Sequence, residues 1–216
     1  MTAALSTIFQ EPDLPVMLRE LNTRFAEERQ MRERFYAEIT PSEKAEFING
    51  QVIMHSPATF EHNETRQNIE HAILQHVRAC EAGRVFAEKI LCVFPRNDYE
   101  PDVCFFTAAR VAKFKRITLK FPPPDFVCEV LSKSTEARDR GIKFKDYAAH
   151  GVREYWLADP RTHVLEQYVT DGKGGYQLRL KSGSGEVEST VIKGFRIPIR
   201  ALFDAKANAA ALKAML

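Results

Sequence analysis

The sequence predicts one α/β domain with a mixed sheet, flanking helices and short additions at both ends. The chain has 216 residues, of which 44% are apolar, so it is long enough to bury one substantial core. Short apolar runs typical of buried strands recur along it, and after Phe126 the order is strand, helix, strand. No internal repeat or long polar linker divides the chain.

Residues 1–39 are expected to form an N-terminal arm. The first 23 residues mix proline, threonine and scattered leucine, whereas Thr23–Ile39 is a highly charged helix candidate with four arginines, Arg24, Arg29, Arg32 and Arg34. Such a helix is either a solvated surface helix or one that binds a partner. The main domain is expected to cover residues 40–200.

This domain is predicted to begin with a hairpin and a long helix. The dipeptide Asn49-Gly50 lies between two apolar-rich runs within Glu46–Met54, and both turn positions of such a hairpin favour positive φ. From Phe60 to Ala82 apolar residues recur at helical spacing. Gly83 is expected to end this helix in the left-handed conformation.

Four strands are predicted next, separated by turns and by the stiff segment Pro122-Pro123-Pro124. They cover residues 85–90, 91–94, 103–106 and 126–131. A helix should follow from Ser134 or Thr135 to His150, and then a strand over Glu154–Ala158. The remaining chain predicts C-terminal hairpins with glycine turns near residues 171–175, and a helical tail over residues 201–216.

Composition and cysteine usage limit the class of protein. The formal net charge is +2, so affinity for nucleic acid would require local clusters of basic residues. The four cysteines form no CxxC pair, and three of them lie in apolar runs, which favours a reducing compartment. No apolar stretch of about 18 residues occurs, so we expect a cytoplasmic protein without membrane association.

Two acidic residues lie beside apolar runs that predict buried strands. Asp102 precedes Val-Cys-Phe-Phe, and Glu129 lies inside Phe-Val-Cys-Glu-Val-Leu. A buried carboxylate needs a partner, and two of them on neighbouring strands can share a hard divalent cation such as Mg²⁺. Alternatively, Asp102 belongs to a Pro-Asp turn and Glu129 is an edge-strand acid that faces water.

Two carboxylates that share Mg²⁺ form the skeleton of a metal-dependent phosphodiesterase. Such an enzyme also needs a nearby ammonium group to stabilise the nucleophile or the charge of the transition state. The position two residues after Glu129 is a leucine, so the candidates are Lys133, Lys143 and Lys145. We favour Lys143, because Asp139, Lys143 and Tyr147 are spaced four residues apart and share one helix stripe. The alternative is an ordinary surface ion pair between Asp139 and Lys143.

A string of motifs over roughly residues 40–180 resembles the Uma-two family, whose members are placed in the PD-(D/E)XK, restriction-endonuclease-like superfamily. The matching segments, in chain order, are Glu46 to Gly50, His55-Ser56-Pro57 with Glu61-His62, Pro101-Asp102, Glu129 to Ser132 with Ser134-Thr135, Asp139 with Lys143 and Tyr147, and Gly151 to Pro160. The ordered string is far more specific than any single motif.

The resemblance implies a restriction-endonuclease-like core in which Asp102 and Glu129 bind Mg²⁺, with Mn²⁺ as a substitute. Lys143 would replace the absent strand lysine. Glu46 and His62 match positions that the family keeps near the site, as an extra acid and as a proton-transfer or phosphate-contacting group. Without the resemblance, Glu46 is a cross-strand partner in the hairpin and His62 an ordinary helix N-terminal side chain.

Three departures from the family pattern leave the acids and the lysine in place. Asn49 stands where aspartate is usual, Lys133 where proline is common, and Ile142 where a polar residue is typical.

Basic residues between the two acidic strands are expected either to follow a DNA backbone or to form a solvated loop. They are Arg110, Lys113, Lys115, Arg116 and Lys120, with Phe114 and Phe121 among them.

The leading hypothesis is therefore an Mg²⁺-dependent endodeoxyribonuclease of a bacterial type, with DNA as substrate. The alternative is a non-catalytic nucleic-acid-binding or assembly module on the same fold, because fold does not dictate activity. A homodimer is expected by analogy, since duplex cleavage needs two scissions.

Overall fold

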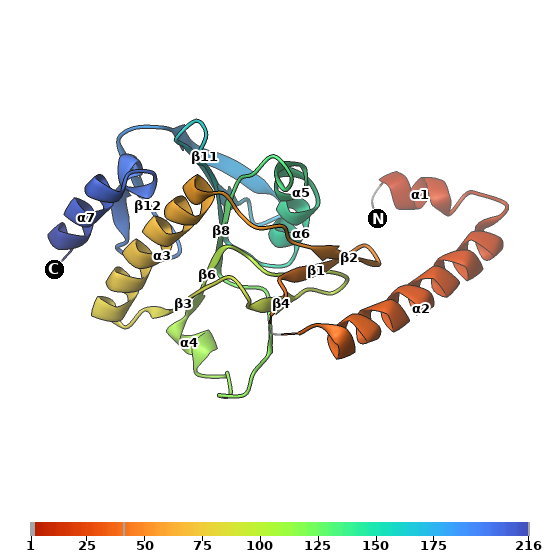
Figure 1. The fold of residues 1–216 in the computed structure, drawn as a ribbon. Helices are drawn as coiled ribbons and strands as arrows, with labels where there is room; N and C mark the ends of the chain where they lie inside the picture. Colours follow the sequence, from red (N-terminus) through yellow and green to blue (C-terminus); the bar gives the residue numbers. More distant parts are fainter. Residues whose placement is uncertain (1–2, 41, 216) are drawn as a thin grey trace.

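A computed structural model describes residues 3–40 and 42–215 and has the predicted mixed α/β fold (Figure 1). Residues 1, 2, 41 and 216, which belong to the predicted arm, domain and tail, lie outside the described part. The central sheet has six strands in the order β11-β10-β9-β8-β6-β3. Their bounds are β3 (Gly83–Ala87), β6 (Val103–Thr107), β8 (Phe126–Val130), β9 (Glu154–Asp159), β10 (Val164–Thr170) and β11 (Tyr176–Ser182).

Strands β8 and β9 are parallel, and the helical connection between them is not the continuous helix predicted up to His150. It consists of α5 (Glu136–Arg138), a π-helical turn over Asp139–Lys143, and α6 (Phe144–Ala149). Hydrophobic periodicity does not distinguish a π-turn from an α-helix, although such turns are frequent at functional sites.

A second sheet packs beside the first, in the order β2-β1-β5-β4-β7. It contains the predicted hairpin of β1 (Ala45–Ile48) and β2 (Gln51–Met54), whose turn residues Asn49 and Gly50 have φ values of 49° and 80°. The strand β4 (Leu91–Val93) was also predicted. β5 (Asp98–Tyr99) and β7 (Lys120–Phe121) were not, because two residues give no periodic pattern.

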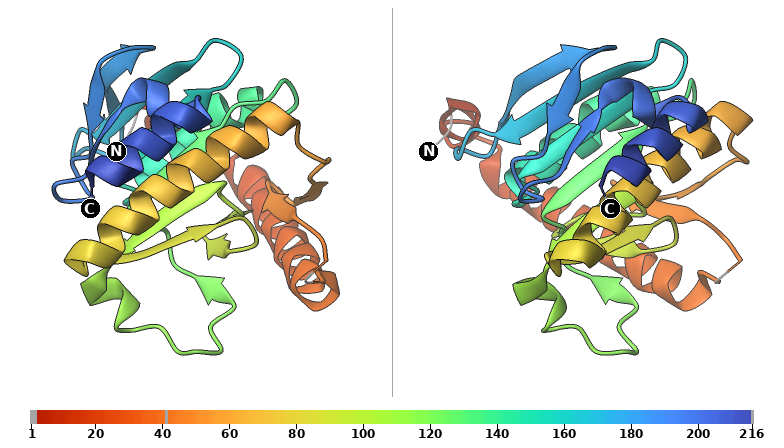
Figure 2. Two further views of the ribbon diagram at one scale, coloured as in Figure 1. Left: turned by 60° about the vertical axis from the view of Figure 1, so that its left-hand side comes forward. Right: turned by 90° about the vertical axis from the view of Figure 1, so that its left-hand side faces the viewer.

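Two helices cover one face of the central sheet, as Figure 2 shows: α3 (Phe60–Cys80) and α7 (Ala205–Ala214). Alternate residues of the strands, such as Val103 and Phe105 on β6, pack beneath them. The prediction for Gly83 is wrong, since Glu81 adopts the left-handed conformation (φ 52°) that ends α3. Gly83 instead begins β3, where a Cβ would collide with the carbonyl oxygen of Phe106.

The other face of the central sheet packs against α6 and the second sheet. Cys104, Phe106 and Val127 point to this side, where they join Tyr147 of α6 and Tyr99 of β5. Because both faces are buried, the strands contain nearly continuous apolar runs. This arrangement leaves little room for an acid in a strand unless the acid has a structural or chemical partner.

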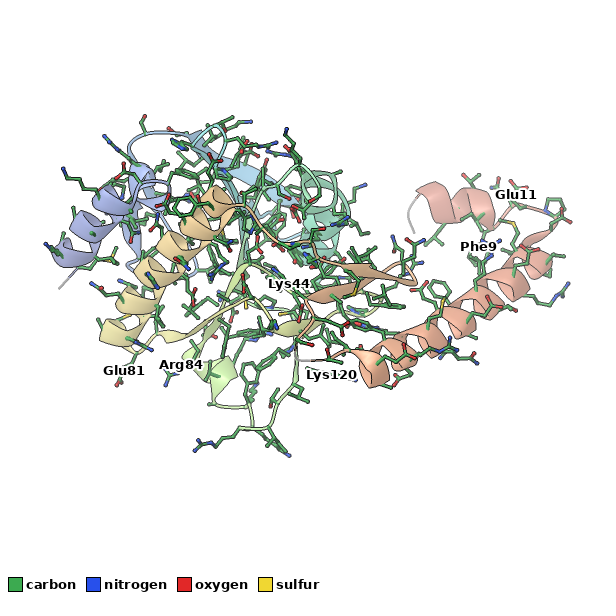
Figure 3. The ribbon with its side chains drawn as sticks, in the orientation of Figure 1. Phe9, Glu11, Lys44, Glu81, Arg84 and Lys120 are labelled. Atoms are coloured by element: carbon green, nitrogen blue, oxygen red, sulfur yellow. The ribbon has the colours of Figure 1, made fainter. Side chains whose placement is uncertain are left out.

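The arm consists of α1 (Ala3–Ile8) and α2 (Leu14–Glu38), and it projects from the body of the molecule (Figure 1). Helix α2 begins before the predicted Thr23, since a proline is well tolerated in its first turn. Phe9 and Glu11, between the two helices, lie at the end of the arm that is farther from the central sheet (Figure 3). The smaller remaining elements are α4 (Ala108–Val111), β12 (Glu186–Glu188), β13 (Arg196–Pro198) and a 3-10 helix over Ile199–Leu202.

Candidate active site

The two predicted metal acids lie opposite each other on neighbouring strands. The antiparallel register of β6 and β8 pairs Val103 with Cys128 and Cys104 with Val127, so Asp102 falls opposite Glu129 and on the same face. Asp102 is 6% exposed and Glu129 is 2% exposed. Strand β8 is central in its sheet, so the alternative of an edge-strand acid facing water is wrong for Glu129.

Main-chain hydrogen bonds hold both carboxylates in place. The amide of Asp102 donates to Oε2 of Glu129 (3.2 Å), and the amide of Val130 donates to Oδ2 of Asp102 (2.9 Å). The ammonium group of Lys44, labelled in Figure 3, donates to Oδ1 of Asp102 (2.9 Å). The reciprocal bonds explain how two acids can lie this close together inside a sheet.

Lys143 is buried at the centre of the site and is only 2% exposed. Its Nζ lies 2.8 Å from Oε1 of Glu46, 3.1 Å from Oε1 of Glu129 and 3.3 Å from Oδ1 of Asp139. The surface ion pair considered for Asp139 and Lys143 is therefore wrong. The other two candidate lysines, Lys133 and Lys145, are both exposed.

Glu46 and His62 reach the same cluster from β1 and from the first turn of α3. Glu46 is fully buried, accepts a hydrogen bond from the amide of Glu100 (3.1 Å), and lies 3.2 Å from Nε2 of His55. Nε2 of His62 lies 3.6 Å from Oδ2 of Asp102. All five site residues predicted from the sequence are thus brought together.

Burial and mutual repulsion separate the pKa values of the carboxyl groups. Burial raises the pKa of Glu129 to about 8, with Asp102 and Asp139 adding to the effect and Lys143 opposing it. Burial by itself raises the pKa of Glu46, but Lys143 and His55 outweigh this effect and lower the pKa to about 2. The pKa of Asp102 is likewise lowered, because His62 and Lys44 overcome the effect of burial.

A cleft of about 760 Å³ opens onto the acids and is lined by Asp102, Glu129, His62, Asp139 and Lys143. The donor set suits a small hard cation, because Asp102 and Glu129 lie opposite each other in register, line the same cleft, and each retain an unused lone pair. Over residues 3–40 and 42–215, no group of three or more His, Cys, Asp or Glu side chains is arranged to hold a metal ion, so the protein would supply two carboxylates at most. Two carboxylates with several waters are a common ligand set for Mg²⁺ in proteins.

Several side chains of the site were not identified as site residues from the sequence. Lys44 binds Asp102, and Tyr147 donates its hydroxyl proton to Oε1 of Glu129 (2.9 Å). The stripe of Asp139, Lys143 and Tyr147 was visible in the spacing, but spacing does not tell which side of a helix is buried. Lys44 had a weaker signal, since it precedes Glu46 by two residues, the period of one strand face.

The basic segment between the acidic strands is mostly separate from this cluster. The side chains of Phe114 and Phe121 pack against Phe106 in the core, and Arg110 contacts Asp125. The aromatic residues of this segment therefore have a structural role. Lys113, Lys115, Arg116 and Lys120 remain exposed.

The fold resembles that of a solved structure. The crystal structure of a "putative nuclease belonging to DUF820" from Anabaena variabilis matches with a TM-score of 0.69 and 19% sequence identity. The match covers 79% of this chain and 96% of that chain. At this level of identity the likeness establishes the fold alone, which is the mixed α/β, restriction-endonuclease-like fold expected from the sequence.

The sequence itself defines the family. The profile of the Uma2 (Uma-two) family, described as "Putative restriction endonuclease", matches residues 25–200. The chain belongs to the Uma2 family, as its motifs indicated. An uncharacterised protein of Synechocystis sp., slr1290, is 28% identical over 149 residues, which are 68% of this chain and 76% of that protein.

Proposed function

We propose that this protein is an Mg²⁺-dependent endonuclease that hydrolyses phosphodiester bonds of DNA. The observation that carries the proposal is the pairing of Asp102 and Glu129 in register, on one face and in one cleft, beside a buried ammonium group. The family description and the fold of the Anabaena protein support the same class of reaction.

Asp102 and Glu129 would hold the cation, Mg²⁺ or in its place Mn²⁺. When bound, such an ion would lower the pKa of a water molecule and offset the negative charge of the phosphate. The protein prepares this site through charge balance. Four buried carboxylates, those of Glu46, Asp102, Glu129 and Asp139, surround the ammonium groups of Lys44 and Lys143, so a further positive charge keeps Glu129 ionised.

Lys143 and Glu46 form the supporting pair of the proposed site. Burial lowers the pKa of Lys143, but Glu129, Glu46 and Asp139 outweigh it and raise that pKa, so the side chain stays an ammonium group. Glu46 fixes its position through the 2.8 Å contact. The ammonium group then orients Glu129 and stabilises negative charge that develops on the reacting phosphate.

His62 lies at the edge of the cleft and supplies a group that can exchange a proton. Its Nε2 faces Asp102, whereas Nδ1 is buried without a hydrogen-bond partner. The position of His62 in the wall of the cleft suits the role expected from the family resemblance, in which the side chain contacts a phosphate oxygen or transfers a proton.

The cellular setting proposed for this enzyme is the cytoplasm of a bacterium. The four cysteines are free thiols, and three of them are buried, which suits a reducing compartment. Of the helices that the structure describes, none combines the length and the apolar character needed to span a bilayer.

We further propose that the enzyme acts as a homodimer that pairs through α2. Leu14, Leu18, Leu21 and Phe25 repeat at the four-three spacing of a coiled-coil seam, and Leu18, Leu21 and Phe25 are 46–49% exposed. The same stripe continues as Glu28, Arg32 and Phe35, which pack on the body of the protein. Helix α2 carries equal numbers of arginine and glutamate, which favours a second copy of itself over a polyanion.

The test of catalysis is a cleavage assay with supercoiled plasmid and linear duplex DNA in Mg²⁺, Mn²⁺ or EDTA. The wild-type protein should cut only with metal, and Asp102→Asn or Glu129→Gln should reduce the rate by about a hundredfold or more. Glu188→Gln, which removes an exposed acid that does not line the cleft, should cut at the wild-type rate. Circular dichroism and thermal unfolding would verify that each variant is folded.

Two outcomes would contradict this proposal. Cleavage that persists in EDTA, or in folded Asp102→Asn protein, would exclude the two acids as metal ligands. DNA retention without cutting under every metal condition would favour the alternative, a non-catalytic nucleic-acid-binding or assembly module.

A further inference from the structure

Arg138 is a cation of the cleft that has no partner in the described protein. It lies at the end of α5 and lines the cleft beside Asp139, and its side chain forms no ion pair or hydrogen bond with residues 3–40 or 42–215. Its Nε is buried without an acceptor. A buried donor that finds no acceptor costs free energy, so such an atom is explained best by a ligand that the site is built to receive.

Three other cations of the cleft, Lys44, Lys143 and Arg161, differ from Arg138 because they are paired with carboxylates. Lys44 and Lys143 are bound to the carboxylates of the site. Arg161 also lines the cleft, but its guanidinium group is already paired with Asp159 and Glu136. Lys143 already contacts three carboxylates, so its proposed role is at the reaction centre and not in holding the incoming strand.

The segment between Glu129 and Arg138 adds hydroxyl groups to the same wall of the cleft. Ser132, Ser134 and Thr135 line it, and the hydroxyl of Ser132 lies 3.2 Å from that of Ser134 and 2.9 Å from that of Thr135. Lys133 is an exposed member of the same wall. Hydroxyl groups beside an arginine and a lysine are the groups with which proteins contact phosphate oxygens.

The charge of the carboxylate cluster makes such a contact necessary. A nucleic acid strand that approaches Asp102, Glu129 and Asp139 meets several negative groups, and phosphate contacts elsewhere must offset this repulsion. The guanidinium group is suited to the task, because it presents parallel N–H donors to two phosphate oxygens.

We infer that Arg138, assisted by Lys133 and the hydroxyl groups of Ser132–Thr135, forms a phosphate-binding subsite that positions the DNA strand in the cleft. The inference rests on the proposed nuclease function and adds a substrate contact to it. Arg138 would act on binding, whereas Asp102, Glu129 and Lys143 act on the reaction.

The experiment separates binding from cleavage. The affinity of wild-type, Arg138→Ala and Arg138→Lys proteins for a fluorescein-labelled DNA duplex is measured by anisotropy in EDTA, over a series of salt concentrations. Arg138→Ala should weaken binding about tenfold and reduce the salt slope by about one. In Mg²⁺ the same variant should raise KM with kcat nearly unchanged, and Arg138→Lys should restore part of the affinity.

Arg161→Ala is the matched control, since Arg161 is a cation of the same cleft that is already paired with two carboxylates. This variant should change the affinity for DNA by about twofold at most. Unchanged affinity and salt slope for folded Arg138→Ala would overturn the subsite. Wild-type protein that binds DNA but never cuts it would overturn the nuclease proposal, while the anisotropy data still decide the role of Arg138. Wild-type protein that does not bind DNA would overturn the subsite as well.

Discussion

Lys143 and the carboxylates around it are stabilised only as a group. The ammonium group contacts Glu46, Glu129 and Asp139 within 3.3 Å and has almost no access to water. Each of these charges would be costly alone, because the protein interior solvates an ion poorly. Removing one partner is therefore expected to cost more than the pair itself contributes.

Lys143→Met should lower the free energy of unfolding by about 3–5 kcal/mol, because it leaves buried carboxylates without their counter-charge. Urea denaturation at neutral pH measures this change. Lys145→Met is the control, since Lys145 is exposed two residues further along; its effect should stay within about 0.5 kcal/mol. Equal stability of the two variants would mean that Lys143 does not hold the carboxylate cluster together.

The buried acids also show why neighbouring identical groups can behave differently. Glu46 lies against Lys143 and His55, which lower its pKa, whereas Glu129 shares Lys143 with other acids, and burial keeps its pKa high. A carboxylate with a raised pKa in a cleft is a group that responds to a bound cation. The environment of each acid therefore matters more than its residue type.

At the scale of elements, the π-helical turn and the arm have separate consequences. The turn over Asp139–Lys143 lies between β8 and β9 and has both of its end residues buried in the site.

Helix α2 is attached to the body at its C-terminal half, where Arg32 donates to both carboxylate oxygens of Asp98 (2.7 and 2.6 Å). Its N-terminal half keeps an apolar stripe in water, which is the basis of the proposed dimer.

Replacing Leu18 and Leu21 with glutamate should convert the proposed dimer to a monomer, because two charges enter an apolar seam. The dissociation constant should rise about tenfold or more, as sedimentation velocity would show. Thr23→Glu with Gln30→Glu adds the same charge on the opposite side of α2 and should leave the dimer intact. A wild-type protein that is monomeric at micromolar concentration would contradict this use of the arm.

At the scale of the whole molecule, ion pairs link the helical segment between β8 and β9 to the outer strands of the central sheet. Arg140 donates two hydrogen bonds to Glu166 of β10 (2.8 and 3.1 Å), and Tyr168 and Lys181 contact the same carboxylate. Burial by itself raises the pKa of Glu166, but the hydrogen bonds from Arg140, Tyr168 and Lys181 outweigh it and lower this pKa to about 2.

Because the pKa of Glu166 is lower in the folded protein than its ordinary value of 4.5, its contribution to stability is present above that value and is lost as the pH falls toward 2. Glu166→Gln should therefore lower the free energy of unfolding by about 1 kcal/mol at pH 7, after allowance for solvent screening. The difference should disappear near the acid end of this window. Chemical denaturation over a pH series measures it, with exposed Glu186→Gln as control; a difference that persists in acid would contradict the assignment.

The sequence determined much of this protein through local rules. The Asn49-Gly50 turn, the strand runs and the periodic helix α3 follow from short-range sterics and hydrophobic spacing, which a chain carries in any context. The acids Asp102 and Glu129 stood out because they interrupt such runs. The motif string gave the Uma2 family, and the profile match confirms it.

Only the tertiary structure decided which side chains meet. The register of β6 with β8 sets Asp102 opposite Glu129, and the packing of α6 turns Lys143 inward, where it reaches Glu46 from a hairpin far away in the chain. Lys44 had only a weak local signal and Arg138 had none, because the sequence does not show whether a cation is paired. Long-range contacts determine charge environment and burial, and these two quantities define the site.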